Sequence, residues 1–163
     1  MWSLGHRNVL GLAFDGAGRL WAAEMGPQGG DELNLIVRGD NYGWPLVSNG
    51  SHYGGADIPD HATRPEFAPP LLSWSPVISP SSVMFYSGSH FPDWQGDAFI
   101  SGLTQGTVSR IEFDGASARE AQRFHFNTRV RDVAQGPEGG IWLLEDGPGG
   151  RLVRYTSATA SPP

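Results

Sequence analysis

Two arginines, Arg129 and Arg131, stand two positions apart in a segment with the apolar pattern of a β-strand. Alternate residues of an extended strand point to the same side, so both guanidinium groups would share one face. Like charges on one face are unfavourable unless an anion lies between them. The pair therefore indicates either a site for an anionic ligand or a solvated edge neutralised by nearby Asp132 or Glu138.

A second candidate site is the loop Gly26-Pro27-Gln28-Gly29-Gly30-Asp31-Glu32. Its glycines leave backbone carbonyls with few steric constraints, and it ends in two acids. Oxygen ligands of this kind suit the hard cation Ca²⁺. The alternative interpretation is an ordinary hairpin loop with solvated acids, because oxygen-rich loops are common.

Composition excludes several function classes. The 163 residues contain no Cys, which removes thiolate metal sites, disulfides and cysteine catalysis. The formal charge is −6 and the 11 Lys and Arg form no run, so no nucleic-acid partner is expected. No apolar run approaches the length of a membrane helix, and no signal peptide is expected at the N-terminus. The composition is compatible with any compartment.

Extended segments separated by Gly, Asp and Pro turns must position these residues. Helical periodicity is confined to a short stretch around 116–122. Two segments echo each other, 11–21 and 131–142, since each reads as an apolar strand, an acidic or Gly turn, and a strand that bears Trp. Repeats of 40 to 60 residues built from strands and turns are typical of propeller blades. The expected strands are 9–14, 19–23, 33–37, 82–86, 97–101, 108–113, 130–135, 140–144 and 152–155.

The strands predict an all-β fold, with three blades at about 5–47, 77–115 and 120–156, each a four-stranded antiparallel sheet. The polar, Pro- and Gly-rich segment 48–76 is expected to be a long inter-blade loop, and 157–163 a disordered tail. Three blades leave apolar flanks exposed, since closed rings have four or more. We expect the remaining blades to come from a missing N-terminal half or from a second copy of this chain.

The sequence resembles the soluble PQQ-dependent aldose sugar and glucose dehydrogenases, the glucose/sorbosone dehydrogenase family, where PQQ is pyrroloquinoline quinone. The resemblance covers about residues 5 to 156 and corresponds to the C-terminal half of a six-bladed family member. It rests on motifs in family order: Gly5-His6-Arg7-Asn8, Glu24-Met25-Gly26-Pro27-Gln28-Gly29-Gly30-Asp31-Glu32-Leu33-Asn34, Asn41-Tyr42-Gly43-Trp44-Pro45, Ile78-Ser79-Pro80-Ser81-Ser82, Trp94-Gln95-Gly96-Asp97, Arg129-Val130-Arg131-Asp132-Val133 and Gly136-Pro137-Glu138-Gly139.

The resemblance implies roles for particular residues. Arg fits such a site because its planar fork binds carboxylates in bidentate fashion, and PQQ carries three carboxylates. The implied cofactor-binding set is Arg7 and Asn8 at the quinone oxygens, Asp31 as a pocket residue, Thr104 at the pocket rim where relatives commonly carry Lys, and Arg129 and Arg131 at the PQQ carboxylates. The implied calcium ligands are the carbonyls of Gly26 and Pro27 and, for a second structural ion, Glu32 and the carbonyl of Tyr42.

No catalytic base is assigned within the chain, because the family's catalytic His belongs to the absent N-terminal half. His52 lies in a sequence that superficially matches the surroundings of that base, but its place in the motif order argues against catalysis. The resemblance implies oxidation of aldose sugars at C1 to lactones when the ring is complete. The alternative is a non-catalytic half-propeller that forms a homodimer and binds a small anionic or sugar-like ligand. Family members are typically periplasmic or secreted.

Overall fold

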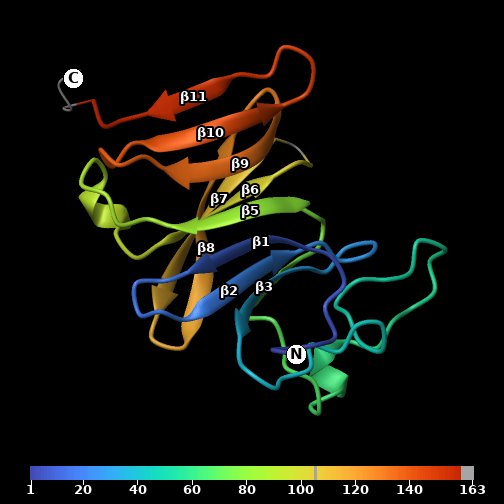
Figure 1. Cartoon of the computed structure of the whole chain (residues 1–163). Helices are drawn as coiled ribbons and strands as arrows, with labels where there is room; N and C mark the ends of the chain where they lie inside the picture. Colours follow the sequence, from blue (N-terminus) through green and yellow to red (C-terminus); the bar gives the residue numbers. More distant parts are fainter. Residues whose placement is uncertain (105, 159–163) are drawn as a thin grey trace.

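The computed structural model describes residues 1–104 and 106–158, and it is built of three antiparallel sheets (Figure 1). Two 3-10 turns, η1 (His61–Thr63) and η2 (Pro92–Trp94), lie in the connections. The first two sheets have four strands each and the third has three among the described residues. In order they are β1 (Val9–Phe14), β2 (Leu20–Glu24), β3 (Asp31–Ile36) and β4 (Leu72–Trp74); β5 (Pro80–Phe85), β6 (Ala98–Gly102), β7 (Thr107–Asp114) and β8 (Ser117–His125); and β9 (Arg129–Gln135), β10 (Ile141–Asp146) and β11 (Leu152–Tyr155).

The echo between the first and third sheets has a structural basis in their hairpin turns. In the β1–β2 turn, the Asp15 carboxylate accepts a hydrogen bond from the indole nitrogen of Trp21 at 2.9 Å. In the β9–β10 turn, the indole of Trp142 donates to Glu138 at 3.3 Å in the same way. Each turn therefore places an acid where it fixes a tryptophan of the following strand.

Successive sheets pack face to face, as the blades of a propeller do. The core between the first and second sheets contains Trp21, Leu33, Trp74, Ile100 and Ile111. A second core between the second and third sheets is formed by Met84, Tyr86, Phe99, Val108, Val130, Val133, Ile141 and Leu143. The innermost strands β1, β5 and β9 lie next to one another in this order (Figure 1). These contacts confirm the predicted all-β arrangement of three stacked blades.

Two outer strands lie beyond the expected blade limits. Strand β4 falls within the segment 48–76 that the sequence indicates as loop, and it pairs with β3. Strand β8 takes up 117–122 of the stretch with helical periodicity and extends the second sheet to His125, past the expected limit of 115. Within 1–104 and 106–158, the third sheet has three strands rather than the expected four, and it begins at Arg129 rather than 120. The predicted tail is described only as far as 158, so 159–163 lie outside the described residues.

The outer strands seal the space between the first two sheets. Trp74 on β4 is buried, and its indole nitrogen donates to Glu120 on β8 at 2.9 Å. Glu120 also accepts hydrogen bonds from Ser109 and from the guanidinium of Arg123. Burial raises the pKa of Glu120, but the hydrogen bonds from Arg123, Trp74 and Ser109 outweigh it and hold this pKa below its usual value.

The Glu120 carboxylate makes the free energy of unfolding depend on pH. A carboxyl group whose pKa is lower in the folded state stabilises the protein above its unfolded pKa, and that stability is lost as the pH falls through the folded value. We therefore expect Glu120→Gln to reduce the loss of unfolding free energy between pH 7 and pH 3, measured by urea denaturation. The exposed Asp57→Asn serves as the matched control and should leave the loss unchanged. An equal pH dependence in wild type and Glu120→Gln would contradict the prediction.

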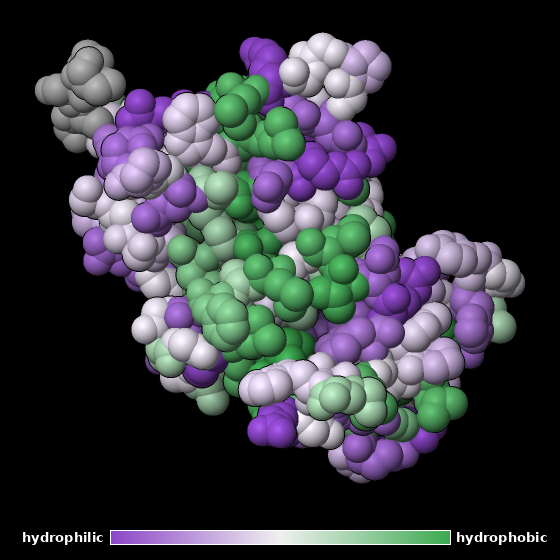
Figure 2. All heavy atoms as spheres, in the orientation of Figure 1, coloured by the Kyte–Doolittle hydropathy of each residue, from purple (hydrophilic) through white to green (hydrophobic). Residues whose placement is uncertain are grey.

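Apolar side chains remain exposed on the outer faces of both end sheets. On β1, the alternating residues Leu10, Leu12 and Phe14 point to the surface, and Leu12 and Phe14 are 63% and 67% exposed. On the third sheet, the paired residues Leu144 and Leu152 are exposed too. Figure 2 shows hydrophobic surface across the middle of one face of the molecule. In the described residues, no helix is long and apolar enough to cross a membrane.

Candidate functional site

The residues singled out from the sequence lie at the same strand ends of the three sheets, and these strand ends form one edge of the molecule. The strand registers define this edge, since Val9 pairs with Glu24, Pro80 with Gly102, and Arg129 with Asp146. The inner strands β1, β5 and β9 therefore begin where β2, β6 and β10 end. The predicted cofactor and calcium residues precede β1, follow β2, follow β6 or begin β9: Arg7, Asn8, Gly26, Pro27, Asp31, Glu32, Thr104, Arg129 and Arg131.

Asp31 ties two loops of this edge together. Its carboxylate accepts a hydrogen bond from the backbone nitrogen of Gly26 at 2.9 Å, and others from those of Ile78 and Ser79 at 2.8 and 2.7 Å. The side chain is buried, and burial raises the pKa of Asp31 although the three N–H donors and Arg7 oppose the shift. Both carboxylate oxygens are occupied by the backbone, so Asp31 positions the loops of the site.

Ser79 belongs to the site, although the sequence alone indicates no role for it. Its backbone has φ of +53°, the left-handed region, and it is the one non-glycine residue with positive φ in the described chain. The nitrogen bond to Asp31 holds this conformation, which turns its hydroxyl to within 2.5 Å of the Thr104 hydroxyl. The Thr104 backbone nitrogen also donates to the carbonyl of Ile78 at 3.2 Å. Thr104 therefore lies at the rim beside Ser79, as a polar group without charge.

Arg7 is held by aromatic rings and one carbonyl. Its guanidinium lies 5.3 Å from the ring centre of Trp44 and 5.9 Å from that of Tyr53, within the range of cation–π attraction. It donates to the carbonyl of Met25 at 2.9 Å and to the hydroxyl of Tyr53 at 3.2 Å. Its Nε is buried and has no hydrogen-bond partner within the described residues. The neighbouring Asn8 is exposed at the start of β1, and its carbonyl accepts from the nitrogen of Met25.

Glu24, which the sequence reasoning did not single out, anchors the segment that carries Arg7. The side chain is buried, and its carboxylate accepts from the backbone nitrogen of Arg7 at 2.8 Å, from His6 at 3.1 Å and from Asn34 at 2.9 Å. Burial raises its pKa, but the hydrogen bonds from His6 and the Arg7 nitrogen outweigh this and keep the pKa of Glu24 below its usual value. A buried anion thus fixes the backbone directly beneath the Arg7 side chain.

Arg129 and Arg131 share a single carboxylate. Their guanidinium groups lie 2.9 and 3.0 Å from the same Asp146 oxygen, and the side chains are 56% and 43% exposed. The sequence indicates Asp132 or Glu138 as the alternative neutralising group, but Glu138 pairs with Arg154 on β11 instead. Two cations and one anion leave a net positive charge at this end of the edge. The pair is therefore available to a further anion.

The glycine-rich loop approaches itself closely at Gly26. A Cβ atom at that position would lie 2.2 Å from the Gly29 carbonyl oxygen and 2.3 Å from that of Gly30, so no larger residue fits without moving the loop. Backbone carbonyl oxygens of Gly29 and Gly30 therefore crowd the space beside Gly26 in this turn. Pro27, the second predicted ligand, is buried next to it.

Glu32 and Tyr42 line a small cavity together with Glu24. Its volume is about 10 Å³, which matches a single water or ion. The Glu32 carboxylate accepts from Asn34 at 3.0 Å and lies 3.3 Å from Nε2 of the buried His61. No cluster of three or more His, Cys, Asp or Glu side chains suited to a metal occurs in 1–104 and 106–158. Calcium at this edge would therefore depend largely on backbone oxygens.

A hollow of about 560 Å³ lies beside the glycine-rich loop and is lined by Pro27, Ser51, Tyr53 and Pro76 among others. Its size falls within the range of about 300–1,000 Å³ typical of small-molecule sites. His52, considered from the sequence as a distant candidate for a base, is exposed in a turn closed by its own backbone. It is the neighbouring Tyr53 that lines the hollow and contacts Arg7.

Comparison with known proteins agrees with this geometry. Residues 1–154 match the Glucose / Sorbosone dehydrogenase family. The Escherichia coli (strain K12) protein named aldose sugar dehydrogenase YliI is 35% identical over 163 residues, which cover 96% of this chain and 43% of that protein.

Two solved structures share the fold. The apo-form of a soluble aldose sugar dehydrogenase from Escherichia coli superposes with a TM-score of 0.85 at 34% identity, covering 94% of this chain and 46% of that one. The PQQ-bound form of an aldose sugar dehydrogenase from Streptomyces coelicolor gives a TM-score of 0.68 at 32% identity, with 94% and 43% covered. The chain, three blades of a β-propeller that span less than half the length of these relatives, therefore belongs to the glucose/sorbosone dehydrogenase family.

Proposed function

We propose that this chain is the cofactor-holding part of a PQQ-dependent sugar dehydrogenase, which oxidises aldose sugars at C1 to lactones once its ring is complete. The observation that carries the proposal is the set of three arginines at one edge. Arg129 and Arg131 share one carboxylate, and Arg7 has a buried Nε without a partner among the described residues. This surplus of cationic donors fits a ligand with several carboxylates.

The residues fit PQQ, with one adjustment to the set expected from the sequence. Arg129 and Arg131 would bind carboxylates, and Arg7 with Asn8 would reach the quinone oxygens. Asp31 would instead stay behind the site, because its oxygens are filled by three backbone N–H groups. When bound, PQQ supplies a two-electron acceptor that takes a hydride from the sugar.

Arg7 would contribute most to the chemistry among the residues of this chain. With PQQ bound, the preorganised Arg7 guanidinium would lie beside the quinone oxygens and would stabilise negative charge on them. Trp44, Tyr53 and the carbonyl of Met25 hold the guanidinium in place before the reaction. The base that takes the sugar hydroxyl proton would come from the rest of the ring, because the resemblance places the family's catalytic His in the half outside this chain.

Calcium forms the second part of the proposal. The carbonyls of Gly26 and Pro27 would hold an ion next to the quinone, and Glu32 with the carbonyl of Tyr42 would hold a second, structural one. The close approach of the Gly29 and Gly30 oxygens to Gly26 supports the first position, and the cavity beside Glu32 supports the second. Both ions would be bound by oxygen, the ligand that Ca²⁺ prefers.

The proposal includes the completion of the ring. The exposed apolar residues on the outer face of β1 and on the third sheet would pack against further blades, as the inner faces of all three sheets already do. We propose that these blades come from a polypeptide outside this chain, which would also carry the base. A homodimer with six blades is the competing arrangement, and light scattering of the isolated chain distinguishes the two.

The proposed function predicts a particular effect on cofactor binding. In the completed protein, Arg129→Gln combined with Arg131→Gln should weaken PQQ binding roughly 100-fold, because two charge-assisted hydrogen bonds are lost. Titration of the PQQ absorbance measures the affinity, and reduction of a dye with glucose and Ca²⁺ measures turnover. Arg119→Gln, an exposed arginine on β8 paired with Glu112, is the matched control. Equal PQQ affinity in wild type and double variant, or no dye reduction by the wild type, would overturn the proposal.

A further inference from the structure

Three serine hydroxyls join the second sheet to the strand that carries the arginine pair. Ser81 and Ser82 lie on β5 and Ser101 on β6, and Ser101 is completely buried. The Ser101 hydroxyl oxygen lies 2.9 Å from that of Ser81 and 2.7 Å from that of Ser82. The Ser81 hydroxyl donates to the carbonyl of Val130 on β9 at 2.9 Å, and the backbone nitrogen of Val133 donates to the Ser82 hydroxyl at the same distance. The three serines therefore contact β9 at two points.

These hydroxyls form one directional chain of hydrogen bonds, the serine relay of Ser81, Ser82 and Ser101. A hydroxyl donates one hydrogen and accepts others. The Val133 amide donates to Ser82, which donates to Ser101. Ser101 donates to Ser81, which donates to the carbonyl of Val130. In this order each hydroxyl donates once and accepts once, and hydrogen bonds in such a chain strengthen one another.

A β-bulge on each strand explains how the relay assembles. The register between β5 and β6 shifts next to Ser82 and leaves Ser81 as an extra residue. The register between β9 and β10 passes from Val130 to Asp132, so Arg131 is the extra residue there. Consecutive side chains of a regular strand point to opposite faces, but a bulge redirects them, so both serines of β5 reach the same hydroxyl. The relay thus bonds to β9 on both sides of the position where the ladder with β10 is interrupted.

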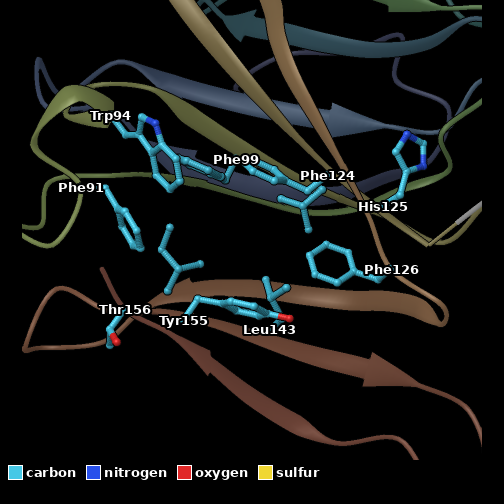
Figure 3. Close-up of a pocket in the computed structure, with 11 residues that line it drawn as sticks. Phe91, Trp94, Phe99, Phe124, His125, Phe126, Leu143, Tyr155 and Thr156 are labelled. Carbon is cyan, nitrogen blue, oxygen red and sulfur yellow. The ribbon is translucent and has the colours of Figure 1, made fainter. Parts of the chain in front are cut away.

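The outer part of the interface between the second and third sheets is loosely packed. A cavity of about 280 Å³ lies there, and Figure 3 shows Trp94, Phe99 and Phe124 facing Leu143 and Tyr155 across it. Its lining comes mainly from η2, β6, β8, β10 and β11. The groups around a void have no packing partner on one side. The position of the third sheet therefore depends strongly on the inner contacts, where the relay connects β9 to β5 and β6.

We propose that the serine relay positions Arg129 and Arg131 for the anion that they bind, so that its three serines are positioning residues of the cofactor site. This inference rests on the proposed function, since it takes PQQ as that anion. The two guanidinium groups share the Asp146 carboxylate and are half-exposed, so their direction depends on the backbone that carries them. The relay bonds to that backbone on both sides of Arg131, and the Ser101 hydroxyl lies 3.5 Å from the Arg131 carbonyl.

Cofactor affinity tests the proposal in the completed protein. Ser101→Ala cuts the relay at its centre and should weaken PQQ binding roughly tenfold, because the charge-assisted bonds of the arginines lose their alignment. Ser82→Ala should cause a similar loss. The double variant should lose little more than either single variant, since both hydroxyls belong to one chain. Ser82→Thr keeps the hydroxyl and should bind PQQ within about threefold of wild type. Titration of the PQQ absorbance measures each affinity.

Ser109→Ala is the matched control. Ser109 is as completely buried as Ser101 and lies on the neighbouring strand β7, but its hydroxyl donates to Glu120. Its loss should lower the free energy of unfolding about as much as Ser101→Ala does, measured by urea denaturation, while the PQQ affinity stays at the wild-type value. A purely structural role of the relay would instead give both variants the same loss of affinity.

Hydrogen exchange of the Val133 amide tests the relay without PQQ. This amide also donates to Asp132 at 2.8 Å, so we expect exchange only roughly fivefold faster than wild type in Ser82→Ala and Ser101→Ala, and unchanged in Ser109→Ala. If the wild type does not bind PQQ, the proposed function fails, and the exchange alone decides whether the relay fixes β9. Equal exchange in wild type and both relay variants would overturn the proposal. Where the wild type binds PQQ, unchanged affinity in Ser101→Ala, or an additive loss of roughly 100-fold in the double variant, would overturn it as well.

Discussion

Arg7→Ala is expected to lower the turnover of the completed sugar dehydrogenase roughly 100- to 1,000-fold, the loss typical of a preorganised charge-stabilising donor. The physical reason is the fixed position of the guanidinium, which Trp44, Tyr53 and the Met25 carbonyl hold beside the site. Removal of the side chain would leave negative charge on the quinone oxygens of the proposed PQQ without a cation beside it. Dye reduction under saturating sugar and PQQ measures the effect, with the loss expected in kcat rather than in KM for the sugar.

Two further variants test whether the loss of turnover comes from the planar guanidinium at position 7. Arg7→Lys keeps the charge but loses the planar fork, so it should recover only part of the activity. Arg38→Ala removes an arginine that also lies over an aromatic ring, that of Trp2, but follows the opposite end of β3. It should leave turnover unchanged. Turnover of Arg7→Ala within threefold of wild type would show that the residue has no part in the chemistry.

The sequence predicted the strands with an apolar pattern far better than the two outer strands β4 and β8. Val9–Phe14 and Leu152–Tyr155 have the expected bounds, because their apolar residues stand next to Gly and Asp turns. Strands β4 and β8 were not predicted. β4 has only three residues in a Pro-rich segment, and β8 has polar or charged residues at most positions, as outer strands do when one face meets water. Such strands are defined by their partners more than by their own residues.

The candidate site was likewise predicted only in part. The sequence identified the residue types at the edge, since Arg129 and Arg131 do share a face and Gly26 does require a glycine. It did not identify the contacts that hold them. Asp146 pairs with both arginines from the adjacent strand, and Glu24 lies 17 residues from the Arg7 nitrogen that it binds. Pairings of this kind depend on the register between neighbouring strands, which cannot be predicted from a single sequence.

Asp31→Ala is expected to lower the free energy of unfolding by roughly 3 to 5 kcal/mol, because it leaves three backbone N–H groups of the buried loops without an acceptor. Gly26, Ile78 and Ser79 lose their common partner, so the left-handed backbone of Ser79 loses its support. Urea denaturation measures the stability, and limited proteolysis at Gly26–Gly30 measures the release of the loop. PQQ affinity should fall as well, since one of these loops carries the proposed calcium carbonyls and the other contacts Thr104.

Asp31→Asn separates the role of the acceptor from that of the charge. The amide retains one oxygen, so it can satisfy some of the three donors, and its stability should fall between those of wild type and Asp31→Ala. The exposed Asp93→Ala is the control for loss of a surface carboxylate. If Asp31 were a direct cofactor ligand, its removal would weaken PQQ binding but change the unfolding free energy by less than about 1 kcal/mol. Surface substitutions generally change the unfolding free energy by no more than about 0.5 kcal/mol. That outcome would move Asp31 from behind the site into it.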